Sequence, residues 1–147
     1  MPPLRDRIVE LRRVPASLID GAPWNWRTHP GEQRAVVQAS IEELGIIDAL
    51  KVRAMPDGRY QLFDGHLRSD LYVTISPDTL VPVLVTDLDE AEAKKANAIF
   101  DPSAAMAEAD AAKLDALLKE IETDSAAIES MLAELAQDNG LAEEVVP

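Results

Sequence analysis

The chain has 147 residues, 47% of them hydrophobic and 28% charged, which is long enough for one compact domain with a core and an appendage. It has no cysteine, which excludes disulfides, thiol catalysis and cysteine-ligated metals and fits a cytoplasmic protein. No apolar run nears the roughly 20 residues of a membrane span. The net charge is −13, and residues 69–147 hold 18 Asp/Glu against 4 Lys/Arg, so the chain alone is a poor candidate for tight non-specific DNA binding.

The N-terminal segment is predicted to form a strand followed by a long loop. The strand covers Arg7–Arg13, and Pro15 ends it. Turn-forming residues then make residues 20–31 a loop. This loop carries a cluster of large and basic side chains, Trp24, Trp26 and Arg27. The two tryptophans either pin the loop to the core or line a pocket into which the arginine points.

The next elements are predicted to be a helix and a β-hairpin. Helical spacing of apolar residues extends from Pro30 to Leu44, and Gly45 ends the helix as a left-handed residue. Leu50–Met55 then alternates as a strand, and a Pro-Asp-Gly turn joins it to a second strand over Arg59–Asp64.

At Gly65 the period-2 pattern of the second hairpin strand changes to a helical pattern. The N-terminus of a helix presents unpaired N–H groups and a partial positive charge, which favour an anion such as phosphate. Gly65 lets the backbone approach such an anion closely, and Arg68 can reach back to it from the first turn. The alternative is an ordinary strand-to-helix corner with a surface histidine, His66, and a surface arginine.

After this helix, Leu80–Thr86 is an almost unbroken apolar run, typical of a strand covered on both faces. Pro82 places this strand at a sheet edge or close to its own start. A helix is predicted from about Leu88 to Phe100. Asp101 followed by Pro102 then indicates a boundary at which a new helix begins.

Beyond this boundary the sequence predicts an acidic helical hairpin over residues 103–137. Its two apolar stripes face each other or a partner; they consist of Leu114, Leu117, Leu118 and Ile121, and of Ile128, Met131, Leu132 and Leu135. We expect two domains, 1–101 and 102–147, with an α+β fold in which a small mixed sheet with helices precedes the hairpin. The last residues, 143–147, are expected to be disordered or to lead into a further domain.

Three segments, in this order and spacing, resemble the N-terminal domain of the ParB family of chromosome-partition proteins, which shares its fold with sulfiredoxin. Asn25–Arg27 is similar to the family's Pro-Arg loop. Ser40–Val52 is similar to the family's segment Ser-Ile-x-x-x-Gly-hydrophobic-x-x-Pro-hydrophobic-x-Val, with Ala49 in place of the proline. Asp64–Arg68 is similar to its Gly-Glu-Arg-Arg phosphate loop. The resemblance covers residues 6–101.

The resemblance implies a site for CTP or ATP with Mg²⁺. The phosphates would be held by Gly65, His66, Leu67 and Arg68. The pocket would be walled by Arg27 and by the 45–51 segment, which includes Gly45, Ile46 and Lys51, and Asn97 would lie near the metal and phosphates. Asp64, next to the phosphate turn, is the candidate Mg²⁺ ligand, because Mg²⁺ needs only one or two carboxylates besides phosphates and water. Zinc is disfavoured, since two histidines and no cysteine leave only carboxylates to complete a site.

The chain also departs from the family. His66 and Leu67 stand where partition proteins carry Glu and Arg, so part of their phosphate clamp is missing. The absence of cysteine excludes sulfiredoxin chemistry. Residues 102–147 contain no counterpart of the family's helix-turn-helix domain. With its Gly-His-x-Arg turn at residues 65–68, and with Asp101-Pro102 followed by an acidic helical tail, the chain looks more like the ParB-like domains of phages and mobile elements that often precede a DNA methyltransferase.

These features predict a nucleotide-binding module in DNA partition, modification or mobile-element biology that contacts DNA only indirectly or through another domain. A second hypothesis is a phosphotransferase or weak NTPase in which His66 or Asp64 is catalytic; an ordinary histidine pKa of about 6.5 suits acid–base work. A third is a protein-interaction domain that has lost its nucleotide. Residues 103–137 would then be its working surface, and they are also the candidate homodimer interface.

Overall fold

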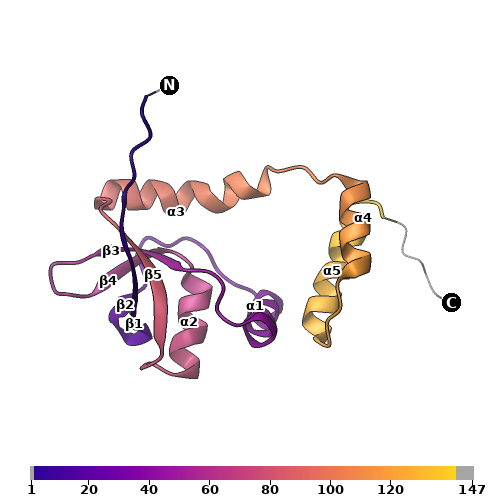
Figure 1. Cartoon of the computed structure of the whole chain (residues 1–147), viewed down its shortest axis with the longest axis horizontal. Helices are drawn as coiled ribbons and strands as arrows, with labels where there is room; N and C mark the ends of the chain where they lie inside the picture. The colour runs from indigo at the N-terminus through magenta and orange to yellow at the C-terminus, as the bar shows by residue number, and fades with distance from the viewer. Residues whose placement is uncertain (1, 142–147) are drawn as a thin grey trace. The chain divides into compact units, whose positions relative to one another are not determined.

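A computed structural model describes residues 2–141 of the chain (Figure 1). Two compact units are present. Unit 1 comprises the residues up to His29 together with Ile46–Ala105, and unit 2 comprises Pro30–Gly45 together with the residues from Met106 onward. The sheet and its helices confirm the α+β class. The division into domains 1–101 and 102–147 stays a prediction, and the expectation for residues 143–147 lies outside the described residues.

Unit 1 is built on a mixed five-stranded sheet in the order β1-β5-β3-β4-β2. The strands are β1 (Ile8–Pro15), β2 (Ile19–Asp20), β3 (Leu50–Ala54), β4 (Tyr60–Asp64) and β5 (Leu80–Thr86). β1 with β5 and β3 with β4 are antiparallel, whereas β3 with β5 and β2 with β4 are parallel. The antiparallel pairing of β3 with β4 confirms the predicted hairpin.

The apolar run in β5 places this strand inside the sheet. Val81 and Val83 are fully buried, and so is Val52 of the neighbouring β3. Because β5 has a neighbour on each side, the edge position offered for Pro82 is wrong, but its position near the strand start is confirmed. Pairing with β3 begins only at Val83, so the missing N–H of Pro82 costs no hydrogen bond between β5 and β3.

Two helices of unit 1 flank the sheet, and Figure 1 shows α3 above the strands and α2 drawn beside β5. α2 (His66–Ile75) buries Leu67, Leu71 and Tyr72, the residues that the helical pattern predicted. α3 (Glu90–Ala105) buries Ala93 and Ala96 against Phe63 of β4, with Trp24 and Leu88 at the border of this cluster. Phe63 and its neighbour Leu62 alternate along β4, so α3 packs on the face opposite to Leu62.

Two local predictions need correction. α3 runs through Pro102 to Ala105, so a new helix does not begin at Asp101. Pro102 forfeits one helical hydrogen bond, and α3 nevertheless continues through it. Asp101, beside it, pairs with Arg27 across the fold, a contact that local sequence does not reveal. The second correction is at Asp20, which the sequence predicts as the start of the 20–31 loop but which belongs to β2, reached through a short 3₁₀ turn, η1 (Ala16–Leu18). A two-residue strand is too short to produce a periodic signal.

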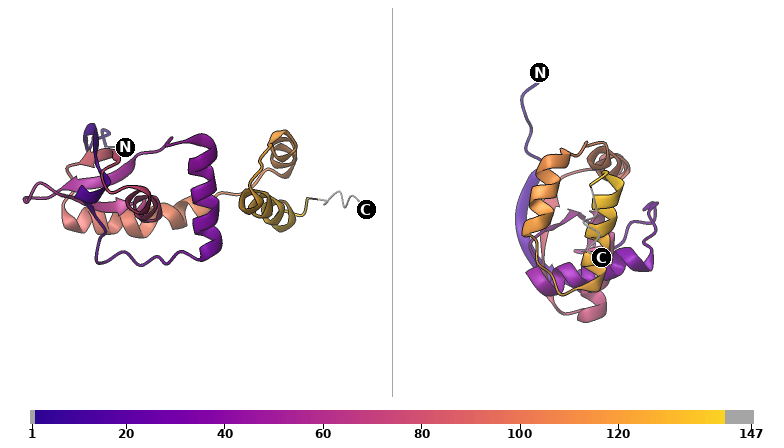
Figure 2. Two further views of the ribbon diagram at one scale, coloured as in Figure 1. Left: turned by 90° about the horizontal axis from the view of Figure 1, so that it is seen from below. Right: turned by 90° about the vertical axis from the view of Figure 1, so that its right-hand side faces the viewer.

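Unit 2 consists of α1 (Gly31–Leu44), α4 (Ala111–Glu120) and α5 (Ala126–Asp138). Figure 2 shows α4 and α5 side by side, as the predicted hairpin requires, and α5 also packs on α1. None of these helices contains a buried residue. A groove of about 400 Å³ lies between α1 and α5, with Val36 and Met131 in its lining.

Within residues 2–141, no helix combines the length and the apolar content that crossing a membrane would require.

Candidate functional site

The corner between β4 and α2 is held in a conformation that only glycine adopts easily. Gly65 has φ 102° and ψ 26°, the left-handed region. A Cβ added to Gly65 would lie 2.6 Å from Cδ2 of Leu50, a side chain that is 1% exposed. The corner therefore excludes a side chain on two independent grounds, backbone conformation and space.

The N-terminus of α2 has the properties of an anion site. The amide of Ser69 donates to the Gly65 carbonyl at 2.9 Å, which is the first bond of the helix, and no side chain caps this end. The amides of His66, Leu67 and Arg68 precede that bond and point toward the helix terminus. Leu67 is buried in the core, so it could contact a ligand only through its backbone N–H.

Arg68 extends from the first turn of α2 and pairs with Asp48. Its Nη1 lies 2.9 Å from Asp48 Oδ2, and both side chains are largely exposed. Asp48 belongs to the segment that joins Ile46, which is 40% exposed, to β3. Arg68, which was predicted to bind phosphate, thus lies at the corner. Its guanidinium is paired with Asp48, a residue for which the sequence predicted no role.

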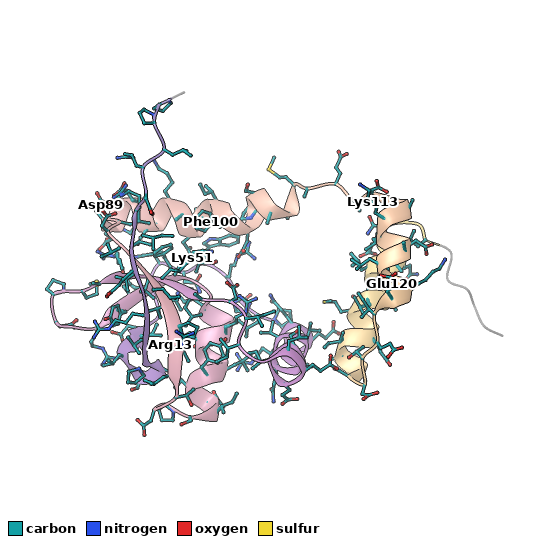
Figure 3. The ribbon with its side chains drawn as sticks, in the orientation of Figure 1. Arg13, Lys51, Asp89, Phe100, Lys113 and Glu120 are labelled. Atoms are coloured by element: carbon teal, nitrogen blue, oxygen red, sulfur yellow. The ribbon has the colours of Figure 1, made fainter. Side chains whose placement is uncertain are left out.

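Lys51 of β3 lies on the other side of the corner. Its Nζ is 2.8 Å from Asp64 Oδ2, the last residue of β4, and 5.2 Å from the centre of the Phe100 ring on α3. Figure 3 shows Lys51 and Phe100 close together where α3 passes the sheet. The side chains of β3, β4 and α3 therefore meet directly beside the glycine turn.

The two tryptophans of the 20–31 loop have different environments, one packed on the core and the other exposed beside Arg27. Trp24 packs against the Phe63 cluster, as expected for a residue that pins the loop to the core. Its indole Nε1 is buried and has no hydrogen-bond partner in the described structure. Trp26 is 56% exposed, and the Arg27 guanidinium lies 4.6 Å from its ring centre. Arg27 Nε also lies 2.8 Å from Asp101 Oδ2 on α3.

Asn97 is a buried polar residue that ties three segments together. Its Nδ2 donates to the Phe63 carbonyl at 3.1 Å and to Asn25 Oδ1 at 3.3 Å. Asn97 thereby holds α3 against the end of β4 and against the tryptophan loop. This places it near the corner, and a contact with phosphate or metal stays a prediction.

His66 caps a backbone amide rather than standing free. Its Nε2 accepts a hydrogen bond from the Ala22 N–H at 3.1 Å, which requires a lone pair on that nitrogen. Burial lowers the pKa of His66, and the nearby carboxylates of Asp70 and Asp64 oppose this shift only in part, while His29 adds to it. His66 is therefore neutral at pH 7, and only Nδ1 remains to donate to a ligand. Catalytic roles for His66 and Asp64 stay predictions.

Two further predicted residues lie at the end of α1 and just after it. Gly45 ends α1 with φ 77°, as the C-terminal pattern predicted, and belongs to unit 2. Ile46 begins the segment of unit 1 that leads to β3. Their roles as pocket wall stay predictions.

A metal site made of protein side chains alone is not present among the described residues, where no group of three His, Asp or Glu side chains is arranged to hold an ion. The predicted ligand at the corner is Asp64, which is engaged with Lys51. A single carboxylate fits Mg²⁺ that arrives with phosphates and keeps its waters.

No protein-family model matches the chain, and no curated protein does. Solved structures do. The C-terminally truncated chromosome-partitioning protein ParB from Caulobacter crescentus, complexed with CTP-γ-S, matches with a TM-score of 0.60 and 23% identity over 90% of this chain and 72% of that chain. The same protein complexed to the centromeric parS site matches with a TM-score of 0.51 and 21% identity over 89% and 65%. A Pnob8-like ParB-N domain gives 0.51 and 16% over 93% and 52%.

The chain spans 65% of the parS-bound protein and 52% of the Pnob8-like domain structure. Identities at this level establish the fold. The sequence resemblance drawn from the tryptophan loop, the 40–52 segment and the Gly65 turn is therefore confirmed at the level of architecture, and the chain has a ParB-like fold.

Proposed function

We propose that this chain is a cytoplasmic, ParB-like, nucleotide-binding module that takes CTP or ATP with Mg²⁺. The observation that carries the proposal is the uncapped N-terminus of α2, which begins at a left-handed glycine with Arg68 in its first turn. One of the similar structures, the ParB protein from Caulobacter crescentus, was determined with CTP-γ-S, which supports the same class of ligand here.

In this proposal the triphosphate lies against the Gly65 turn. The backbone amides of His66, Leu67 and Arg68 donate to phosphate oxygens, and the Arg68 guanidinium adds a charge-assisted, two-pronged contact. Lys51, which pairs with Asp64, and Arg27, which pairs with Asp101 on α3, would supply further positive charge. Asp64 joins a phosphate-bound Mg²⁺, and Asn97 fixes the α3 side of the pocket.

DNA enters the proposal only indirectly. A similar ParB structure is complexed to parS, but this chain carries a net charge of −13, which disfavours contact with a polyanion. We propose a role in partition, DNA modification or mobile-element biology in which another domain or chain contacts DNA. Association of two copies through residues 103–137 belongs to the same proposal, since Leu117, Met131 and Leu135 on α4 and α5 expose apolar surface.

Calorimetric titration with CTP, ATP and GTP, each with Mg²⁺, tests the proposal. We expect saturable binding of one nucleotide, weakened about 10- to 100-fold by Arg68→Ala, because one charge-assisted contact contributes about 1.5–3 kcal/mol. Arg13→Ala is the matched control, since Arg13 is an exposed arginine on β1, the strand at the opposite edge of the sheet from β2. Circular dichroism should show the same fold for both variants. Equal affinity in the Arg68 and Arg13 variants, or no binding of any nucleotide, would refute the proposal.

A further inference from the structure

The cations at the candidate phosphate site are all neutralised by aspartates of the same unit. Each of the three pairs has an N···O distance of 2.8 or 2.9 Å. The pairs are Arg27 with Asp101, Lys51 with Asp64, and Arg68 with Asp48. The carboxylates come from three different elements, α3, the end of β4 and the segment before β3, so the pairing is not a consequence of one local sequence motif.

These pairs are of the exchangeable kind. The side chains of Arg27, Lys51 and Arg68 are 30%, 37% and 41% exposed. The pairs of Lys51 and Arg68 are in contact with solvent and are individually weak, whereas Arg27 Nε is buried and its partner Asp101 is 51% exposed. A phosphate offers an arginine two acceptor oxygens and more charge than a carboxylate. A polyphosphate that also gains the α2 amides could therefore replace the carboxylates, whereas an anion with a single charge gains too little.

We propose that Asp48, Asp64 and Asp101 are exchangeable counter-ions that a polyphosphate must displace, and that they set both the affinity and the selectivity of the site. The proposal rests on the nucleotide-binding function above. In the ligand-free protein the carboxylates compensate the three cations. A ligand with several phosphates replaces them, and Asp64, released from Lys51, is then available to Mg²⁺. Smaller anions such as inorganic phosphate bind more weakly because they cannot replace more than one carboxylate.

The test uses a substitution that should strengthen anion binding. Asp48→Asn removes the charge that occupies Arg68, and its side-chain oxygen can still accept from the Ala49 amide as Asp48 does. We expect the variant to bind CTP, ATP or GTP, whichever the wild type binds, about 1.5- to 5-fold more tightly, because an exposed ion pair of this kind is worth a factor of that size. Inorganic tripolyphosphate, which has no base, should show the same gain.

Selectivity supplies the second readout. The ratio of the dissociation constants for inorganic phosphate and tripolyphosphate should fall in Asp48→Asn, which a merely structural role of Asp48 would not produce. Asp78→Asn is the matched control, because Asp78 is an exposed aspartate beyond the far end of α2, about 15 Å along the helix from Gly65. It changes the net charge equally and should leave both constants unchanged.

The outcomes separate the two proposals. If the wild type binds a nucleotide and Asp48→Asn binds it with equal or lower affinity, the counter-ion role is wrong while nucleotide binding stands. An equal gain in Asp78→Asn would also refute that role, since the effect would then reflect net charge alone. If neither protein binds any nucleotide or tripolyphosphate, both proposals fail together. Asp101→Asn, which frees Arg27, repeats the test at a second cation.

Discussion

Replacing Gly65 with alanine tests whether the corner between β4 and α2 is as constrained as its geometry indicates. Two costs add. A φ of 102° is in the left-handed region, where a residue with a Cβ loses about 1–2 kcal/mol. The new Cβ would also lie 2.6 Å from Cδ2 of the buried Leu50, and overpacking of this kind costs about 1–3 kcal/mol.

One term acts in the opposite direction. Alanine restricts the unfolded chain more than glycine does, which reduces the loss in the free energy of unfolding by about 0.4–1 kcal/mol. The net loss in the free energy of unfolding for Gly65→Ala is therefore about 3 kcal/mol, a large part of the roughly 5–15 kcal/mol that holds a typical domain folded. At a urea dependence of about 1–3 kcal/mol per molar, the midpoint of unfolding should fall by about 1–3 M.

Urea unfolding followed by tryptophan fluorescence measures this loss, since Trp24 packs against the Phe63 cluster of the same unit. Gly58→Ala is the control, because Gly58 also has a positive φ, 82°, but an added Cβ would meet no atom within 4 Å. It should show the backbone cost alone. Leu50→Val removes the methyl group that would clash with the new Cβ. The loss of stability in the double variant should therefore be smaller than the sum of the losses in the two single variants. An equal loss in the Gly65 and Gly58 variants would show that the close approach to Leu50 does not matter.

Two remaining predictions concern pH. Arg7 lies 2.7 Å from Glu92 and lowers the pKa of that carboxyl to about 2, so the ion pair stabilises the fold above the ordinary pKa of 4.5 and loses its contribution as the pH falls from there toward 2. Glu92→Gln should flatten this part of the curve of urea midpoint against pH. Burial lowers the pKa of His66 below its ordinary 6.5, so the unfolded state binds the proton more readily and stability should fall as the pH drops below about 6.5. An NMR titration of His66 with a midpoint at or above 6.5, or an unchanged pH dependence in His66→Ala, would contradict this.

Local patterns in the sequence predicted the elements that carry the site. Alternation and the Pro-Asp-Gly turn located the β3–β4 hairpin, and the change of period at Gly65 located the start of α2 within one residue. These signals are strong because the apolar residues that make the pattern are buried, as Leu62 and Leu71 show. The need for glycine at position 65 also follows from a local conformation that few other residues adopt.

The features that the sequence did not reveal depend on contacts between distant residues. The ion pairs of Arg27 with Asp101 and of Arg68 with Asp48 join residues 74 and 20 positions apart, and no local pattern indicates which acid will meet which base. The amide cap from His66 to Ala22 joins residues 44 positions apart. The continuation of α3 past Pro102 is likewise not indicated by the local sequence.

The net charge of the whole chain does not represent the charge of unit 1, where the candidate anion site lies. The acidic residues are concentrated in unit 2, where Pro30–Gly45 and residues 106–141 contain 12 Asp/Glu and 3 Lys/Arg. Unit 1 contains 13 Asp/Glu and 11 Lys/Arg, which is close to neutral. At physiological ionic strength charges more than about 8 Å apart are largely screened, so an anion at the Gly65 corner responds mainly to the charges of its own unit. The acidic composition that argues against DNA binding by the whole chain therefore does not argue against a nucleotide in unit 1, where Arg68, Lys51 and the α2 amides lie at the corner and two nearby carboxylates, Asp48 and Asp64, are paired with those cations.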